Sequence, residues 1–206
     1  MANHVTTVVQ FHQLNDAGLA LIQELYSRIR PSAEDRHYEW FGDIWGLDKA
    51  ITDKYDWTTN KIGPNWCYFE DKMDDQFVLI SAWSPPVQGL QWLFDRIAEV
   101  DNDFIASVQY DDEGLNFYGA QVYTSEGVYD EFEDEYEELV EDLKDSIPEI
   151  KELFTEDCDE DEVRESDEFS DLFSEHAWEY FGERQYNFIQ EILECIHNDR
   201  NPPPDE

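Results

Sequence analysis

The first 123 residues alternate between two hydrophobic periods, and each change of period marks a predicted element. The β-branched run His4–Phe11 predicts a strand, and apolar residues at three- and four-residue steps in Ala17–Arg30 predict a helix. Four more strands are predicted at Trp66–Asp71, Gln76–Trp83, Phe104–Tyr110 and Leu115–Tyr123, and a second helix from Ser84-Pro85-Pro86 to Val100. This order predicts an α+β fold, a ferredoxin-like antiparallel sheet with two helices and an added strand, ending near Tyr123.

Two parts of the chain depart from this pattern. The segment His37–Asn65 is dense in aromatic residues but follows neither period, so we interpret it as a packed aromatic insertion. Beyond Gly127 the chain shows two acidic helical patterns, Tyr129–Phe154, which Pro148 interrupts, and Asp167–His197. The predicted domains are therefore a ferredoxin-like core of residues 1–127 and an acidic helical extension of residues 128–206.

Two segments carry a family resemblance. Phe77–Pro86 reads FVLISAWSPP and Tyr110–Tyr123 reads YDDEGLNFYGAQVY. They resemble the YubB-like family of phage, plasmid and genomic-island proteins, in which a strand runs into an AWSPP turn and an acidic turn precedes a strand with a glycine. The resemblance covers roughly Val5–Val128 and implies a ferredoxin-like domain and an origin in a mobile element. A mobile-element protein without recognisable chemistry is often a modulator of host machinery.

The charge of the chain is extreme and unevenly distributed. There are 51 acidic residues against 13 basic ones, which gives a net charge of −38. Aromatic residues make up 15% of the chain, so a folded core is expected rather than disorder. Residues 126–175 hold 24 acidic and three basic residues, a net charge of −21, and the other 156 residues carry −17. A solvated helix face and adaptation to high salt remain alternatives, although the second predicts an even spread.

The acidic segment has the charge density of a nucleic acid. If its fifty residues were all helical, they would span about 75 Å, with one carboxylate per ~3.1 Å. One strand of B-DNA carries one charge per roughly 3.4 Å. Apolar residues at helical spacing predict an ordered helix with one buried face; they are Phe132, Tyr136, Leu139, Val140, Leu143 and Ile147. The predicted like-charge pairs on its other face are Glu131 with Glu135, Asp134 with Glu138, and Glu137 with Glu141.

Several classes of protein are excluded by what the sequence lacks. No basic cluster exists to bind nucleic acid or an anionic membrane, and no apolar window approaches a membrane span. The three cysteines form no CxxC pair, the N-terminus shows no export signal, and we expect a cytoplasmic protein. No histidine pair, P-loop, GxSxG or GxGxxG pattern appears, so we expect no enzyme, no cofactor and no metal.

One segment resembles a calcium-binding loop in part. Carboxylates fall at its positions 1, 3, 5, 9 and 12; they are Asp157, Asp159, Asp161, Glu165 and Glu168. Glu162 stands where the loop turn needs glycine, and Arg164 replaces a hydrophobic anchor. An exposed acidic linker is therefore the favoured interpretation.

The sequence predicts an acidic inhibitor that imitates DNA and blocks a host DNA-handling or anti-phage defence protein, as anti-restriction proteins do. Its partner would be a basic DNA-binding protein, nuclease or defence complex, met in the host cytoplasm if a phage encodes the chain. The predicted partner-binding residues are Glu131, Glu133, Asp134, Glu135, Glu137, Glu138, Glu141 and Asp142.

An alternative function uses aromatic residues instead of charge. In it the chain is a non-enzymatic adaptor that binds a protein through Trp40, Trp45 and Trp57, and the charge serves solubility. The aromatic residues of the last helix could likewise form a contact surface or dock that helix on the core; they are Phe169, Phe173, Trp178, Tyr180, Phe181, Tyr186 and Phe188. The sequence leaves open whether the chain forms a homodimer.

Overall fold

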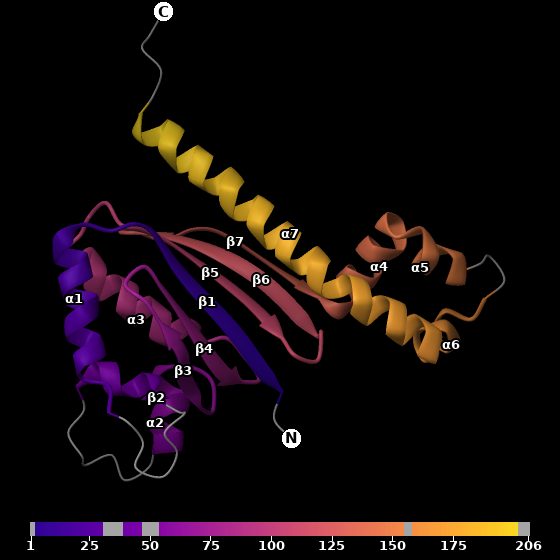
Figure 1. Cartoon of the computed structure of the whole chain (residues 1–206), viewed down its shortest axis with the longest axis horizontal. Coiled ribbons are helices and arrows are strands. Elements are labelled where there is room, and N and C mark those ends of the chain that lie inside the picture. The colour runs from indigo at the N-terminus through magenta and orange to yellow at the C-terminus, as the bar shows by residue number, and fades with distance from the viewer. Residues whose placement is uncertain (1–2, 31–38, 47–53, 155–157, 202–206) are drawn as a thin grey trace, which may run out of the picture. The chain divides into compact units, whose positions relative to one another are not determined.

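A computed structural model describes residues 3–30, 39–46, 54–154 and 158–201 of the chain (Figure 1). The chain divides into two compact units. The first unit consists of Met1–Gly114 and Gly119–Phe132, and the second of Leu115–Tyr118 and Glu133–Glu206. The division into residues 1–127 and 128–206 remains our sequence-based prediction of the domains.

The fold is α+β, as predicted, and is built on a seven-stranded antiparallel sheet with the order β2-β3-β4-β1-β5-β6-β7. Its strands are β1 (His4–Gln13), β2 (Glu39–Trp40), β3 (Cys67–Lys72), β4 (Gln76–Ala82), β5 (Ile105–Asp112), β6 (Phe117–Thr124) and β7 (Gly127–Glu135). The five strands predicted in the first 123 residues are confirmed, with ends shifted by at most two positions. The sheet continues to Glu135, so the prediction that it ends near Tyr123 was wrong.

Two helices of the first unit, α1 (Asp16–Ser27) and α3 (Val87–Ala98), cover the same face of the sheet (Figure 1). Alternate residues of β1 are buried there, and Phe11 meets Phe94 of α3 edge to face at 6.3 Å. Tyr26 of α1 packs in the same way on Phe77 of β4. Strands of period two and helices with one apolar stripe therefore meet as the sequence pattern predicts.

The helix predicted at Ala17–Arg30 is present as α1, which begins one residue earlier. The side-chain oxygen of Asn15 accepts hydrogen bonds from the backbone N–H groups of Ala17 and Gly18, both at 2.9 Å. This cap satisfies two donors that a helix leaves unpaired at its beginning. The helix ends at Ser27 rather than at Arg30.

The aromatic insertion is packed, as predicted. It contains β2, a 3₁₀ helix η1 (Phe41–Trp45) and α2 (Lys54–Lys61), while its residues 37–38 and 47–53 lie outside the described part of the chain. Trp57 contacts both Trp40 and Trp45, and Trp45 stacks on Trp92 with ring centroids 4.1 Å apart. The indole N–H of Trp40 donates to the Thr58 hydroxyl at 3.1 Å. These indoles hold the insertion together by contacting one another.

The helix predicted from Tyr129 begins only at Tyr136, which corrects the first acidic pattern. Residues Gly127–Glu135 form β7, and the helices that follow are α4 (Tyr136–Ser146), α5 (Pro148–Leu153), α6 (Glu160–Arg164) and α7 (Asp167–Arg200). Pairing with β6 makes this segment a strand rather than a helix, and Gly119 of β6 lets the two strands approach closely. A Cβ built at Gly119 would lie 2.5 Å from the carbonyl oxygen of Phe132. The strand also separates Glu131 from Glu135, which would repel each other at i and i+4 of a helix.

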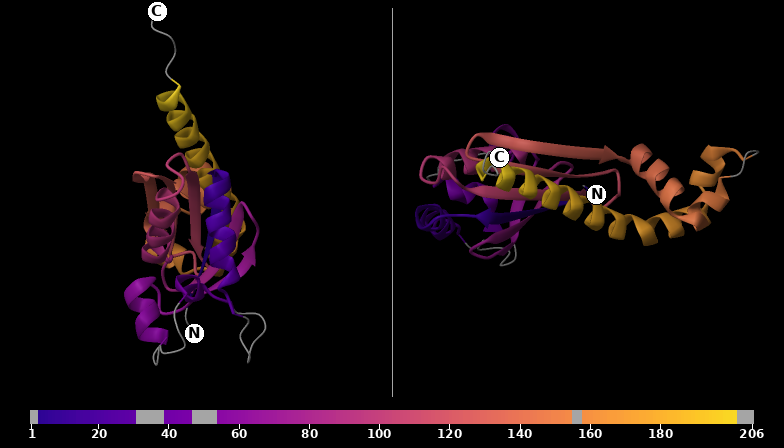
Figure 2. Two further views of the ribbon diagram at one scale, coloured as in Figure 1. Left: turned by 90° about the vertical axis from the view of Figure 1, so that its left-hand side faces the viewer. Right: turned by 90° about the horizontal axis from the view of Figure 1, so that it is seen from above.

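The second acidic helix was predicted correctly and is the longest of the described elements, with 34 residues. Ser166 caps its beginning, since the Ser166 hydroxyl accepts from the Phe169 N–H at 3.2 Å. Both views in Figure 2 show α7 as one continuous helix. No helix within the described residues is long and apolar enough to cross a membrane.

One carboxylate in the sheet should make the stability of the protein depend on pH. Burial, with the nearby charge of Asp112, raises the pKa of Asp111 from 3.8 to about 6. Because the folded chain binds this proton more tightly than the unfolded chain, Asp111 costs no stability below pH 3.8 and costs most above pH 6. We expect Asp111→Asn to raise the free energy of unfolding at pH 7.5 by about 1–2 kcal/mol, after solvent screening.

Urea unfolding at pH 7.5 and at pH 4 measures this effect. The gain should fall to about 0.5 kcal/mol or less at pH 4, where the folded wild type already carries the proton. Asp75→Asn, at an exposed position of the β3–β4 turn, removes the same charge as a control and should show no such difference. An equal gain at both pH values would contradict the assignment.

Candidate partner-binding surface

The eight predicted binding residues lie on β7 and α4. Glu131 belongs to the first unit, and the other seven belong to the second. Glu131 accepts a hydrogen bond from the Gln121 side-chain amide at 2.7 Å. On α4, Leu139, Val140 and Leu143 are buried, so its acidic residues face the other way as predicted. Phe132 lies on the strand, so it does not belong to the apolar face of the helix.

Two of the seven carboxylates cap α4. Glu135 is the N-cap residue, and its backbone N–H donates to the Glu138 carboxylate at 2.7 Å. The Glu135 side chain accepts in return from the backbone of Glu138. This reciprocal pair places negative charge at the positive end of the helix dipole, so both residues stabilise α4 whatever else they contact.

Two further carboxylates are held by Arg184 of α7. The guanidinium lies 2.8 Å from Asp134 and 3.2 Å from Asp142. Tyr118 donates its hydroxyl hydrogen bond to Asp134, and Tyr180 donates to Asp142, each at 2.8 Å. Burial and the Asp134 carboxylate raise the pKa of Tyr118 well above its ordinary value, so its phenol stays a donor. Asp134 and Asp142 therefore act first as structural residues that fasten α7 to the end of β7 and to α4.

Arg164 and Lys144 neutralise part of the remaining charge on α4. Arg164 of α6 pairs with Glu137 and lies 3.5 Å from Glu141. Lys144 lies 3.5 Å from Glu141 and 3.4 Å from Glu160. The predicted like-charge pair Glu137 and Glu141 thus shares a cation. Four of the seven predicted residues in this unit take part in ion pairs, which weakens the field they can offer a partner.

The partial calcium-loop pattern has a different structural use. Asp159 caps α6, since its carboxylate accepts from the Asp161 N–H at 3.1 Å, and Arg164 ends that helix in the ion pair with Glu137. Asp157, the first position of the pattern, lies outside the described residues. In the part of the chain that is described, no group of three or more His, Cys, Asp or Glu side chains could hold a metal ion.

A more continuous row of carboxylates lies on α7 and includes none of the eight predicted binding residues. We define the α7 acidic row as Glu168, Asp171, Glu175, Glu179 and Glu183, all of them exposed. None forms an ion pair with another described residue. With Asp167, the row places six carboxylates along about 24 Å of helix, with a mean spacing of ~5 Å, and no Lys or Arg lies between them.

The signal for this row was present in the sequence. Carboxylates recur at every fourth position from Asp171 to Glu183. Buried residues recur with the same step on another side of the helix; they are Phe169, Phe173, Ala177, Phe181 and Gln185. Two stripes of equal period on one helix indicate one packed face and one charged face.

The aromatic residues of α7 divide between the two interpretations left open above. Phe169, Phe173 and Phe181 are buried, and Phe181 stacks on Tyr118 with ring centroids 4.0 Å apart. Trp178 and Tyr186 instead keep 45% and 59% of their surface exposed. The phenylalanines therefore dock the helix, while the tryptophan and one tyrosine remain on the surface.

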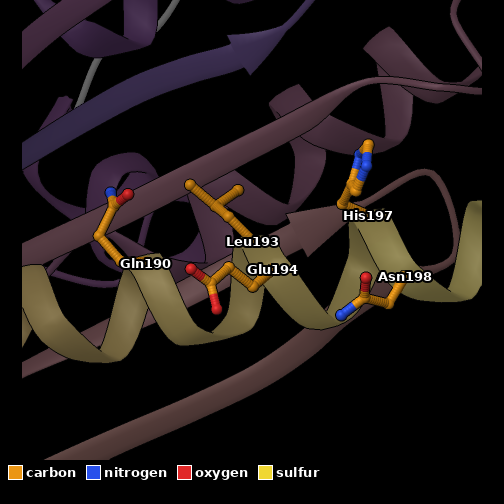
Figure 3. A pocket seen from close by; sticks show the side chains of 5 residues that line it. All are labelled: Gln190, Leu193, Glu194, His197 and Asn198. Atoms are coloured by element: carbon orange, nitrogen blue, oxygen red, sulfur yellow. The ribbon is translucent and has the colours of Figure 1, made fainter.

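A shallow hollow of about 330 Å³ lies further along α7 (Figure 3). It is lined by Gln190, Leu193, Glu194, His197 and Asn198. In this view Gln190, Leu193 and His197 project above the helix, and Glu194 and Asn198 lie across its front (Figure 3). One carboxylate, one imidazole and two amides on a single helix can form hydrogen bonds to a partner.

Comparison with known proteins finds no family model that matches the chain and no matching curated protein.

Proposed function

We propose that the protein is an acidic DNA mimic that binds and blocks a basic DNA-handling or anti-phage defence protein. The observation that carries this proposal is the α7 acidic row, in which ordered carboxylates follow one another without a neutralising cation. Such a row offers fixed negative charge to a groove lined by Lys and Arg, and its mean spacing of ~5 Å, with Asp167 included, is of the same order as the roughly 3.4 Å between the charges of one DNA strand.

The repulsion within the row supports a functional origin. Asp171, Glu175, Glu179 and Glu183 form three like-charge pairs at i and i+4, each costing the helix roughly 0.2–0.5 kcal/mol. A helix face selected only for solubility could mix both signs of charge and avoid that cost. We extend the binding surface from the seven α4 and β7 carboxylates of this unit to the α7 acidic row.

We further propose that β1, α1, β3, β4, α3 and β5 form a ferredoxin-like unit. The order β3-β4-β1-β5, with a helix after β1 and another after β4, supports this. With the likeness of Phe77–Pro86 and Tyr110–Tyr123 to the YubB-like proteins, it points to a mobile-element protein that acts in the host cytoplasm. The proposed targets are host nucleases and restriction or other defence complexes.

The aromatic adaptor is the weaker candidate. Its three residues, Trp40, Trp45 and Trp57, contact one another within the insertion, and Trp40 is buried. A partner could reach only parts of Trp45 and Trp57, so this cluster offers little of the exposed area that an interface anchor needs.

Affinity capture from a bacterial lysate tests the proposal. The wild-type chain is compared with a row variant, Asp171→Asn, Glu175→Gln, Glu179→Gln and Glu183→Gln. A control variant removes four exposed carboxylates of the first unit, by Glu70→Gln, Asp74→Asn, Asp75→Asn and Glu126→Gln. At roughly 0.5 kcal/mol per exposed ion pair, the row variant should bind its partner about thirtyfold more weakly, while the control keeps the wild-type affinity.

Competing duplex DNA should release the captured protein, and raising the salt concentration should weaken the complex. The proposal would be overturned if the row variant still captured the same protein and if neither competing DNA nor high salt released it. That result would also restore the interpretation of the acidic surface as a solvated face.

A further inference from the structure

Two exposed aromatic residues lie on one side of α7 with a glycine between them. Trp178, Gly182 and Tyr186 follow one another at four-residue steps, so they lie on one side of the helix over about 12 Å. Gly182 is exposed, and a Cβ built there would meet no atom within 4 Å. We name these three residues the α7 aromatic stripe.

The glycine in this stripe lowers the stability of the helix. Glycine in a helix interior destabilises it by roughly 0.5–1 kcal/mol relative to alanine. Since no atom of the protein crowds this position, packing within the chain does not require the missing side chain. Its absence instead leaves an open notch between two exposed rings, which a side chain or backbone from outside can enter.

The aromatic stripe borders the acidic row. Glu175, Glu179 and Glu183 each precede a member of the stripe by three residues, and residues at i and i+3 are neighbours on a helix surface. Each ring therefore has a carboxylate beside it, and so does the notch. Trp178 is held in place by an edge-to-face contact with the buried Phe181, with centroids 5.5 Å apart.

Arginine is the side chain that fits this combination best. Its guanidinium stacks on the faces of Trp and Tyr and forms paired hydrogen bonds with a carboxylate, while its stem is apolar. Lysine carries a compact, strongly hydrated charge and gains less from a ring. A second copy of this chain is disfavoured as the occupant, because it would bring the same carboxylates and a net charge of −38 against them.

We propose that an arginine-bearing helix of the basic partner docks along α7, with guanidinium groups on Trp178 and Tyr186 and beside Glu175 and Glu183. The partner approaches α7 most closely at Gly182, where no atom of the chain lies within 4 Å of a Cβ position. Arginines at every fourth position of such a helix repeat every ~6 Å, which equals the rise between successive carboxylates from Asp171 to Glu183. This inference rests on the proposed function and names the chemistry of its partner.

The test uses the full-length protein and two labelled helical peptides of equal length, one with arginine and one with lysine at every fourth position. Fluorescence anisotropy measures their binding at 0.15 M salt. The stripe variant, Trp178→Ala with Tyr186→Ala, should bind the arginine peptide about tenfold more weakly than the wild type, because two exposed cation–π contacts are lost. Binding of the lysine peptide should change much less.

Two further variants sharpen the result. Gly182→Leu fills the notch without removing a charge and should also weaken binding of the arginine peptide. Tyr55→Ala with Met73→Ala removes two exposed apolar side chains elsewhere and should leave binding unchanged. Unchanged affinity of the stripe variant for the arginine peptide would overturn the inference, and so would an equal loss for both peptides.

The two proposals can fail separately. If the row variant loses the lysate partner while the stripe variant binds the arginine peptide normally, the docking inference fails and DNA mimicry stands. The opposite result is that the stripe variant no longer binds the arginine peptide, while capture of the lysate partner is unchanged by the row substitutions and by competing DNA. In that case DNA mimicry fails and the arginine-binding stripe stands.

Discussion

Replacing Phe181 with alanine should lower the free energy of unfolding of the second unit by about 3–5 kcal/mol. Only 2% of the Phe181 side chain is exposed, and its ring stacks on Tyr118 at 4.0 Å with an angle of 19°. The substitution removes that stack and leaves a cavity below Trp178. Urea unfolding measures the loss, with the helical signal followed by circular dichroism at about 222 nm.

Tyr186→Ala is the matched control for this prediction. Tyr186 lies on the same helix and 59% of it is exposed, so its removal should change the free energy of unfolding by less than about 0.5 kcal/mol. If Phe181→Ala costs no more than this control, then the packing between α7 and Tyr118 does not hold the second unit together. In that case the α7 acidic row would also lose its fixed geometry.

Replacing Arg184 with methionine should cost about 1–3 kcal/mol. The guanidinium joins Asp134 to Asp142, and the Asp134 side chain is only 14% exposed. Methionine keeps much of the apolar stem but leaves two carboxylates close together without a cation. The cost lies between that of an exposed ion pair and that of a buried one, because Arg184 itself is partly exposed.

Two comparisons isolate the charge effect at Arg184. Arg96→Met breaks an exposed pair with Glu99 at 2.9 Å and should cost at most about 1 kcal/mol. Adding Asp134→Asn and Asp142→Asn to the Arg184 variant should recover part of the loss, since the repulsion is then removed. If the triple variant is less stable than the single one, the carboxylates are held by the two tyrosine hydroxyls rather than by the arginine.

The part of the fold that local patterns specify could be predicted from the sequence. Period-two runs such as Gln76–Ala82 placed strands, the apolar steps in Ala17–Arg30 placed a helix, and Pro148 marked a break between two helices. Each of these signals involves residues a few positions apart, so no knowledge of the tertiary structure was needed.

The segment Gly127–Glu135 shows where local patterns are insufficient. Its residue Phe132 lies four positions before Tyr136, a spacing that favoured a helix. The backbone of Phe132 instead lies against Gly119 of β6, and Glu131 accepts a hydrogen bond from Gln121 of the same strand. Strand pairing supplied the decisive contacts, and such pairing is not visible in the periodicity of one segment.

By itself the sequence determined the sign, amount and concentration of the charge, because these follow from counting residues. Only the tertiary structure decided which carboxylates keep their charge available to a partner. Arg184 reaches Asp134 from fifty positions away and Arg164 reaches Glu137 from 27, while the α7 acidic row meets no cation among the described residues. A carboxylate's field depends on the cations within a few ångströms of it, and folding sets those distances.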